Sequence, residues 1–244
     1  MIDTFEKLKN SSLQFGLIVN ENKTKYMKCT TKETQLDRLR VDNMQIDQVK
    51  SFSYLGAIVN GNNTLEEEIR ERIAKMRIKL FFKSNLVSRK SKLKLYRSVI
   101  RPVVLYGCET WVIKESIIKR LSVFERKILR EIFGPTKEDN GIWRIRTIKE
   151  LDELIKHRNV INYFKAQRLS WFGHIYRMPE TSIVKRIYKW KPFTGRPAGS
   201  PKSRWEDDVR NELRKAKLVK WTEQVQDCLK WKGVVGKVKT VPGL

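Results

Sequence analysis

A basic tract without a single acidic side chain constrains this chain more than any other feature of its sequence. No aspartate or glutamate lies between Arg72 and Cys108. The cations of this tract are Arg72, Lys75, Arg77, Lys79, Lys83, Arg89, Lys90, Lys92, Lys94, Arg97 and Arg101. Two further acid-free stretches cover residues 154–179 and 181–204. Such segregation predicts continuous positive surfaces on the folded protein rather than faces of mixed charge.

The whole chain carries the same imbalance. Its 52 lysines and arginines outnumber its 27 aspartates and glutamates, which gives a formal net charge of +25. A compact fold with this charge repels itself unless a polyanion neutralises it, so nucleic acid is the expected partner. The alternative interpretation is a basic protein whose helices are merely solvated.

Other features argue against a membrane protein and a disulfide-bonded one. The sequence has no run of about 18 apolar residues that would span a bilayer, and residues 1–10 do not resemble a secretion signal. Cys29, Cys108 and Cys228 are far apart, which predicts reduced thiols. We therefore expect an intracellular location, in the nucleus or the cytoplasm, and no membrane partner. The sequence predicts no oligomeric state.

Apolar residues recur at helical spacing from Thr64 onward, which predicts a series of amphipathic helices. The stripes are Leu65, Ile69, Ile73, Met76 and Leu80; Leu93, Tyr96, Ile100 and Val104; Leu121, Phe124, Ile128 and Ile132; Ile161, Phe164, Trp171 and Ile175; and Trp205, Val209, Leu213 and Ala216. Thr64 with Glu67, and Ser203 with Glu206, have capping-box spacing. Pro102 predicts a kink or a break near Arg101, because proline removes a backbone donor.

The first sixty residues have a different pattern. A short helix is expected before Gly16, and residues 17–19, 26–31 and 52–59 have strand character, the last most clearly. The turn-forming residues 60–63 end that segment. The predicted fold class is therefore α+β and mostly α.

Several short segments have distinctive amino-acid sequences. They are LQFGLIVN with KTKYM (residues 13–20 and 23–27), FSYLG (52–56), LYGCETW (105–111), RLSWFGHIYRM (168–178), and GRP with RWEDDV (195–197 and 204–209). In this order they resemble the distal part of non-LTR (LINE-type) retrotransposon reverse transcriptases. In that family they correspond to the motif after the catalytic hairpin, the primer grip, the thumb, the post-thumb segment and a segment near the end.

The resemblance implies a division of the chain. A small β-containing palm remnant is expected over residues 1–63, a thumb-like helical bundle over 64–133, a linker over 134–142, a second helical module over 143–232 and a flexible tail over 233–244. It also implies the activity class, RNA-directed DNA polymerase, and the partner, which would be RNA, an RNA–DNA hybrid or DNA.

The resemblance does not extend to the family's catalytic metal site. Polymerase chemistry needs two Mg²⁺ ions about 3.5–4 Å apart, held by carboxylates, and an aromatic-x-Asp-Asp hairpin supplies these upstream of the first matched segment. Asp3 is the lone aspartate before Leu13. We therefore expect no metal site, no cofactor and no autonomous DNA synthesis in this chain. Mg²⁺ is expected only for the full-length polymerase.

Lys23 matches a family position proposed to protonate the leaving pyrophosphate, so it is a vestigial general-acid candidate. Without the aspartates its role reduces to a phosphate contact. A solvated turn lysine is the alternative.

Candidate nucleic-acid contacts fall into three groups. The first is the helical ridge of Lys75, Lys79 and Lys83 with Arg89, Lys90, Lys92 and Lys94, which would contact phosphates without reading sequence. The second, Arg196, Lys202 and Arg204, flanks a Gly/Pro-rich connector, where Trp190 and Phe193 could stack on bases. The third is Phe52 and Tyr54, which either touch a primer backbone or pack on a core. Leu55, Trp171 and Trp205 are expected in the core.

Other polar residues are interpreted as structural. Asp207 and Asp208 fall in the first turn of a predicted helix, where carboxylates meet the positive end of the helix dipole. His157 and His174 lack cysteine or histidine partners at ligand spacing, so no zinc site is predicted.

Two alternative functions stay open. In the first, the chain is the C-terminal part of an active reverse transcriptase whose gene model is truncated. In the second, it is a co-opted, non-enzymatic scaffold that binds an acidic partner.

Overall fold

The computed structural model describes residues 1–30, 35–76, 79–191, 204–218 and 220–240. It divides into two compact units, Met1–Arg70 and Glu71–Leu244, each of which is described by itself. About 57% of the chain is helical and the sheets have two or three strands, so the predicted α+β, mostly α, class is confirmed.

The first unit combines one helix with two small sheets. Its elements are α1 (Ile2–Gln14), the 3-10 turn η1 (Glu21–Lys23), β1 (Lys25–Tyr26), β2 (Arg38–Val41), β3 (Met44–Gln48), β4 (Ser51–Tyr54) and β5 (Ala57–Asn60). β3 lies between β1, to which it is parallel, and β2, to which it is antiparallel. Val41 and Ile46 are buried on this sheet.

The predicted strand over residues 52–59 is a hairpin. β4 and β5 pair antiparallel with Tyr54 opposite Ala57, so only Leu55 and Gly56 form the turn. Both have positive φ, 49° and 80°, as a type I′ turn requires. Leu55 is consequently 74% exposed, and its expected place in the core is wrong. Residues 17–19 are not in a strand.

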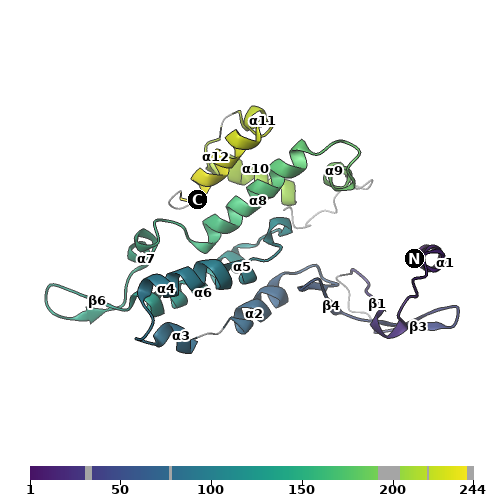
Figure 1. Ribbon diagram of the computed structural model, residues 1–244, viewed down its shortest axis with the longest axis horizontal. Coiled ribbons are helices and arrows are strands. Elements are labelled where there is room, and N and C mark those ends of the chain that lie inside the picture. Colours follow the sequence, from purple (N-terminus) through teal and green to yellow (C-terminus); the bar gives the residue numbers. More distant parts are fainter. Residues whose placement is uncertain (31–34, 77–78, 192–203, 219, 241–244) are drawn as a thin grey trace. The chain divides into compact units, whose positions relative to one another are not determined.

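The second unit is helical apart from one hairpin (Figure 1). α2 (Glu66–Lys75) crosses the boundary between the units. The next elements are α3 (Lys79–Lys83), α4 (Arg89–Leu95), a π-helical turn η2 (Tyr96–Ile100), α5 (Arg101–Val104), the 3-10 turn η3 (Cys108–Thr110) and α6 (Glu115–Phe133). The irregularity expected at Pro102 takes the form of the π turn, and the proline itself sits in the first turn of α5, where its missing N–H is tolerated.

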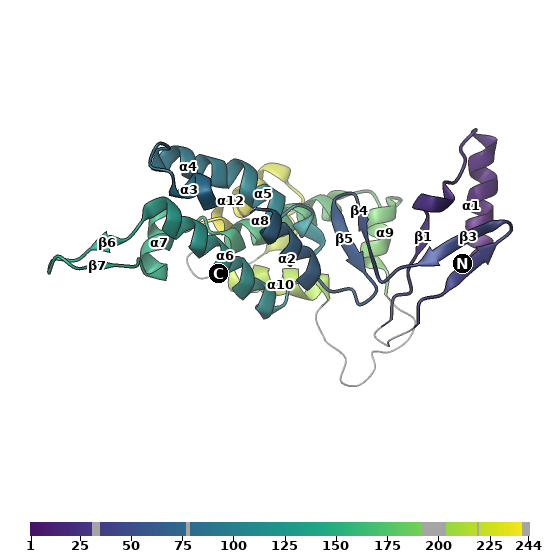
Figure 2. The same cartoon turned by 90° about the horizontal axis from the view of Figure 1, so that it is seen from below.

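The C-terminal part is built around one long helix. Its elements are β6 (Thr136–Lys137), β7 (Trp143–Arg144), α7 (Ile148–Leu154), α8 (Val160–Arg177), α9 (Ile183–Lys189), α10 (Trp205–Lys215), α11 (Trp221–Gln224) and α12 (Cys228–Val238). β6 and β7 form a hairpin arm that projects from the helices within the expected linker (Figure 2). Ser203, the expected cap of α10, lies outside the described residues.

Aromatic rings fill the core around α8. Phe172 is buried, and its ring centroid lies 5.4 Å from that of Trp221, 6.2 Å from that of Trp231 and 6.3 Å from that of Trp205. The Trp205 indole N–H donates to the Glu109 carbonyl at 2.7 Å, so its expected core role is confirmed. Val234, Val235 and Val238 of α12 are buried in the same cluster. The chain is helical from Gly233 to Val238, which is the first half of the expected tail.

A buried ion pair ties α8 to α10. The Arg168 guanidinium donates to both carboxylate oxygens of Glu212, and its Nη1 donates to the Trp111 carbonyl at 3.2 Å. Asp208 lies 3.5 Å from the same Nη1. Both carboxylates thus contact this arginine. For Asp208, which lies in the first turn of α10, the contact agrees with the structural interpretation.

Replacement of Gly173 tests the packing of α8 against α12. A Cβ at Gly173 would overlap the indole of Trp231, whose N–H donates to the Leu169 carbonyl at 2.9 Å. We expect Gly173→Ala to lower the free energy of unfolding by about 1–3 kcal/mol, as overpacking does. The control is Gly236→Ala on α12, where nothing lies within 4 Å of an added Cβ. That change should leave stability equal or raise it. Thermal unfolding followed by tryptophan fluorescence measures both, and equal melting temperatures would contradict this packing.

The carboxyl of Glu125 should make stability depend on pH. Burial raises its pKa from 4.5 to about 7, against the opposing hydrogen bonds from Tyr96 and Val160. The folded state thus binds a proton more tightly than the unfolded state, so stability is greatest below about pH 4.5 and falls as pH rises through 7. We expect Glu125→Gln to remove a decline on the order of 2–3 kcal/mol over this range. Urea titrations at several pH values measure it. The exposed Glu153→Gln variant is the control, and a decline that persists in Glu125→Gln would contradict this assignment.

Candidate nucleic-acid interface

One helical stretch, from α4 through the π turn to α5, carries a line of cations of which two are exposed. Ser88 caps its start, because its hydroxyl accepts the Ser91 N–H at 3.1 Å. Lys90, Lys94, Arg97 and Arg101 follow at intervals of four, three and four residues, and this spacing places them along one side of a helix. We call these four residues the cationic stripe.

Burial separates the members of the predicted ridge. Arg89, Lys90 and Lys94 are exposed, whereas Lys92 is only 6% exposed. Lys92 therefore lies on the inner side of α4, two residues away from each neighbour in the cationic stripe. The remaining two members of the stripe, Arg97 and Arg101, are half-buried, because the helix here runs toward α8.

Contacts with α8 and the loop before it fix the end of the cationic stripe. The Arg101 Nη1 donates to the Arg158 carbonyl at 3.2 Å, and its guanidinium carbon lies 4.1 Å from the centroid of the Tyr163 ring. The Lys239 amine lies 5.9 Å from the same ring. Four cations from three parts of the sequence thus meet here: Arg97, Arg101, Arg158 and Lys239.

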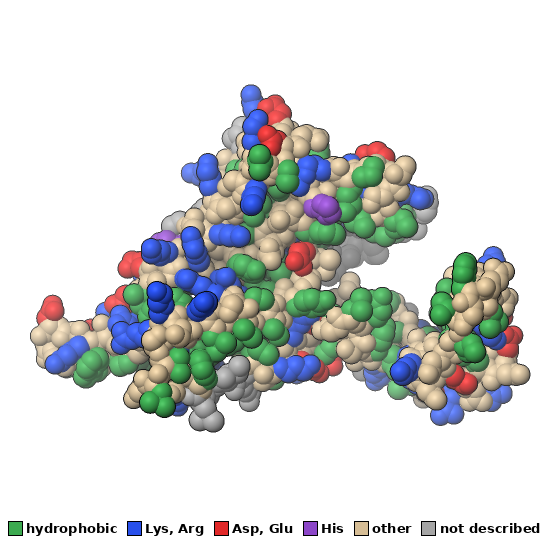
Figure 3. Space-filling model, viewed as in Figure 1, with side chains coloured by type: hydrophobic (Ala, Val, Ile, Leu, Met, Phe, Trp, Pro, Cys, Tyr) green, Lys and Arg blue, Asp and Glu red, His purple; other side chains and the backbone are tan. Residues whose placement is uncertain are grey.

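Like charges dominate the electrostatics of this junction. Burial and then the charges of Arg101 and Arg158 lower the pKa of Arg97. The carboxyl of Glu125 lies in the core beneath, where it accepts hydrogen bonds from the Tyr96 hydroxyl at 2.5 Å and the Val160 N–H at 2.9 Å. On the face shown in Figure 3, lysines and arginines gather over α4 and over the junction of α7 with α8. The arrangement suits a polyanion.

The other predicted cations occupy separate places. Lys75, in the last turn of α2, pairs with Glu71 at 3.4 Å, and Lys83 is exposed at the end of α3. Arg204 is exposed directly before α10. Arg196, Lys202 and Phe193, like the side chain of Lys79, lie outside the described residues. Trp190 is described and is 63% exposed.

The predicted contacts of the first unit are all at its surface. Phe52 and Tyr54 both project from β4, are 40% and 58% exposed, and have ring centroids 6.2 Å apart. Lys23 is exposed at the end of η1, and its N–H is accepted by the side chain of Asn20.

Arg72, which begins the acid-free tract, is structural. It is buried, and its Nη1 donates to the carbonyls of Val104 and Tyr106. Its guanidinium carbon also lies 5.4 Å from the centroid of the Trp111 ring. A cation in an acid-free tract is thus not always a surface cation.

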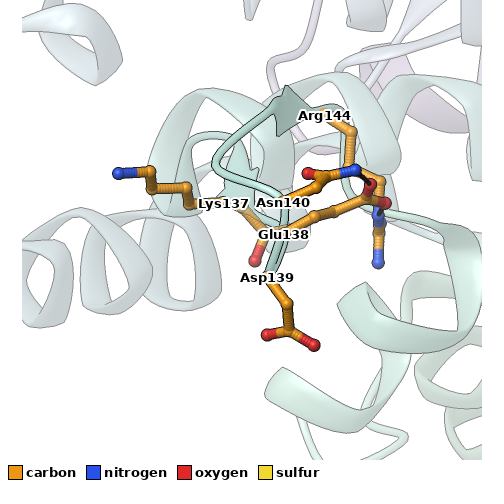
Figure 4. Close-up of a pocket in the computed structure, with 6 residues that line it drawn as sticks. Lys137, Glu138, Asp139, Asn140 and Arg144 are labelled. Carbon is orange, nitrogen blue, oxygen red and sulfur yellow. Dashed lines mark hydrogen bonds and ion pairs between the residues drawn. The ribbon is translucent and has the colours of Figure 1, made fainter.

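The hollow on the β6–β7 arm does not offer a second anion site. Arg144 points toward Glu138, while Lys137 and Asp139 point away from it (Figure 4). The Arg144 guanidinium lies 2.6 Å from a carboxylate oxygen of Glu138 and 2.6 Å from one of Glu150. The hydrogen bond from Arg144 lowers the pKa of Glu150 to about 2. The charge of the arginine is thus already compensated by the two carboxylates.

The histidines and acidic residues are accounted for by local contacts. His157 Nδ1 lies 2.7 Å from Asp152, and the ring centroid of His174 lies 5.4 Å from that of Trp171, which is half-buried. Within the described residues, no group of three or more His, Cys, Asp or Glu side chains could hold a metal ion. Over the same part of the chain, no helix has the length and apolar character needed to cross a bilayer.

The partners of the cationic stripe were not predicted from the sequence. Arg158 lies in the second acid-free stretch, which was a usable signal, but nothing in the sequence pairs it with Arg101. Tyr163 and Lys239 gave no signal at all.

Comparison with known proteins points to mobile elements. An uncharacterized transposon-derived protein of Caenorhabditis elegans is 23% identical over 96% of this chain and 88% of its own length. A Drosophila melanogaster protein, named for an RNA-directed DNA polymerase from the transposon X-element, is 25% identical over 50% of this chain. The match covers only 14% of that polymerase's length. No protein-family profile and no solved structure matches the chain. The chain is a retrotransposon-related protein.

Proposed function

We propose that this chain binds nucleic acid without sequence preference, as the C-terminal part of a LINE-type reverse transcriptase. The observation that carries the proposal is the cationic stripe, whose Lys90 and Lys94 are open to solvent on a tract with no acidic residue. The similarity to transposon-derived proteins also supports this proposal.

The dimensions of the cationic stripe suit a nucleic-acid backbone. Arg101 follows Lys90 by eleven positions, so the stripe is about 16 Å long at a rise of 1.5 Å per residue. Each strand of a duplex presents a phosphate about every 3.4 Å along its axis. The stripe therefore spans several phosphates. Contacts of lysine and arginine with phosphate give affinity without reading bases.

The exposed rings supply a second kind of contact in this proposal. Trp190 is open to solvent, and a base stacked on such a ring contributes about 1–3 kcal/mol. Phe52 and Tyr54 lie side by side on β4, as residues that touch a primer would. Lys23 is placed to meet a phosphate, with no part in proton transfer.

DNA synthesis is not part of the proposed function of this chain alone. The two metal ions of a polymerase need carboxylates that are free to bind them, and Asp208 and Glu212 are committed to Arg168. These two carboxylates therefore do not fit a Mg²⁺ pair, and in this proposal Mg²⁺ is bound only by the whole polymerase.

Salt dependence tests the binding function. The logarithm of the association constant for an RNA–DNA hybrid should fall linearly with the logarithm of salt concentration, by about 0.9 for each phosphate neutralised. The double variant Lys90→Gln/Lys94→Gln should reduce that slope by about 1.8, since both contacts are lost. Its control, Lys232→Gln/Lys237→Gln, removes the same charge from exposed positions on α12. Fluorescence anisotropy measures the constants, and a wild-type affinity that does not change with salt would contradict the function.

Primer extension tests the second part of the proposal. We expect the purified chain to add no nucleotide to a primed RNA or DNA template in the presence of Mg²⁺ or Mn²⁺. A full-length retrotransposon reverse transcriptase serves as the positive control for the template. Incorporation directed by the template would contradict the proposal, and it would favour the alternative of an active enzyme.

A further inference from the structure

We propose that Arg97, Arg101 and Arg158 form a discrete site that holds one phosphodiester of a bound nucleic acid. The proposal rests on the binding function above and names the place on that surface where the backbone is held. It differs from the ridge expected from the sequence, because Arg158 comes from the loop between α7 and α8.

Arg101 is the fixed element of this site. Its guanidinium lies over the Tyr163 ring at 4.1 Å and donates to the Arg158 carbonyl at 3.2 Å. Its Nε is buried and has no hydrogen-bond partner within the described residues. An aromatic face and one neutral carbonyl hold the side chain in place. Its positive charge also favours the ionised form of the buried Glu125 carboxyl.

Arg97 and Arg158 place two more charges next to the fixed one. Arg158 is exposed and Arg97 is half-buried. Burial lowers the pKa of Arg97 most, and Arg101 and Arg158 are near enough for their charges to lower it further. Holding like charges this close is unfavourable in the free protein, and a bound phosphate, with its negative charge and several acceptor oxygens, relieves it.

The nearby carboxylates offset the charge of the three arginines only in part. Glu125 interacts with Arg97 and Arg101, but it is buried and its pKa is raised to about 7, so it is only partly ionised near neutral pH. Its oxygens accept bonds from Tyr96 and Val160. Asp152 receives His157 at 2.7 Å and the side-chain amide of Asn159 at 3.0 Å. The positive charge that remains at the site is available to a ligand.

The surroundings indicate that the ligand is a nucleic-acid phosphate rather than a free anion. Lys90 and Lys94 extend from Arg97 along the same side of the helix, so a strand held at the arginines continues onto the lysines. Lys239, 5.9 Å from the Tyr163 ring, adds charge from the C-terminal helix. Several cations in a row beside a fixed arginine can contact successive phosphates of one nucleic-acid strand.

Single and paired substitutions test the site. Arg158→Gln leaves the backbone carbonyl that accepts from Arg101 in place, and the Arg158 side chain is exposed, so the fold should persist. We expect Arg158→Gln and Arg97→Gln each to weaken binding of a short RNA–DNA hybrid roughly tenfold at about 0.1 M salt. The control, Lys232→Gln, loses the same charge from an exposed position on α12 and should weaken it by no more than about twofold. Circular dichroism verifies that the variants are folded.

The double variant Arg97→Gln/Arg158→Gln decides whether the two arginines share one phosphate. Shared contacts make the combined loss smaller than the product of the single losses. The proposed site is contradicted if the double variant weakens binding by the product of the two single factors. It is also contradicted if Arg158→Gln weakens binding no more than Lys232→Gln does. In both cases salt-dependent binding by the rest of the surface would still hold. If the wild-type chain binds no hybrid, the proposed function falls, and the site falls with it.

Discussion

The buried carboxyl of Glu125 is the contact on which the arrangement of the basic surface depends. It belongs to α6 and accepts hydrogen bonds from the Tyr96 hydroxyl of the π turn and from the Val160 N–H, the first of α8. Three elements from separate parts of the chain are thereby held at one point. Arg101 follows Tyr96 by five residues and Arg158 precedes Val160 by two, so the same contact brings these arginines together. The carboxyl also lies at the start of α8, where the helix dipole favours negative charge.

Structural and surface cations have different partners in this protein. Arg72 and Arg168 are buried, and they donate to carbonyls or to a carboxylate while lying over aromatic rings. These arginines hold helices together, because their guanidinium groups bond to acceptors within the fold. Within the described residues, Lys90 and Lys94 of the cationic stripe have no such partners. The cations that make up the formal charge of +25 therefore differ in role: some bond within the fold and others face solvent.

Much of the fold could be predicted from the sequence, because the relevant signals are local. The apolar stripes at helical spacing predicted α6, α8 and α10, and the class was confirmed. The turn at Leu55 and Gly56 was missed because it depends on positive φ at a leucine, which sequence pattern alone does not indicate. The inward position of Lys92 was missed because charge does not show which side of a helix a residue occupies. The partnership of Arg101 with Arg158 and Tyr163 depends on long-range packing, which no local pattern in one sequence encodes.

The central claim is that phosphates are held along the stripe and at the arginines beside α8. The most direct measurement is cross-linking of a bound RNA–DNA hybrid to the wild-type chain, with the attached peptides identified by mass spectrometry. The account predicts cross-links concentrated on residues 89–104 and 156–163. Cross-links spread evenly over the exposed lysines and arginines, or confined to α9 and α12, would contradict it.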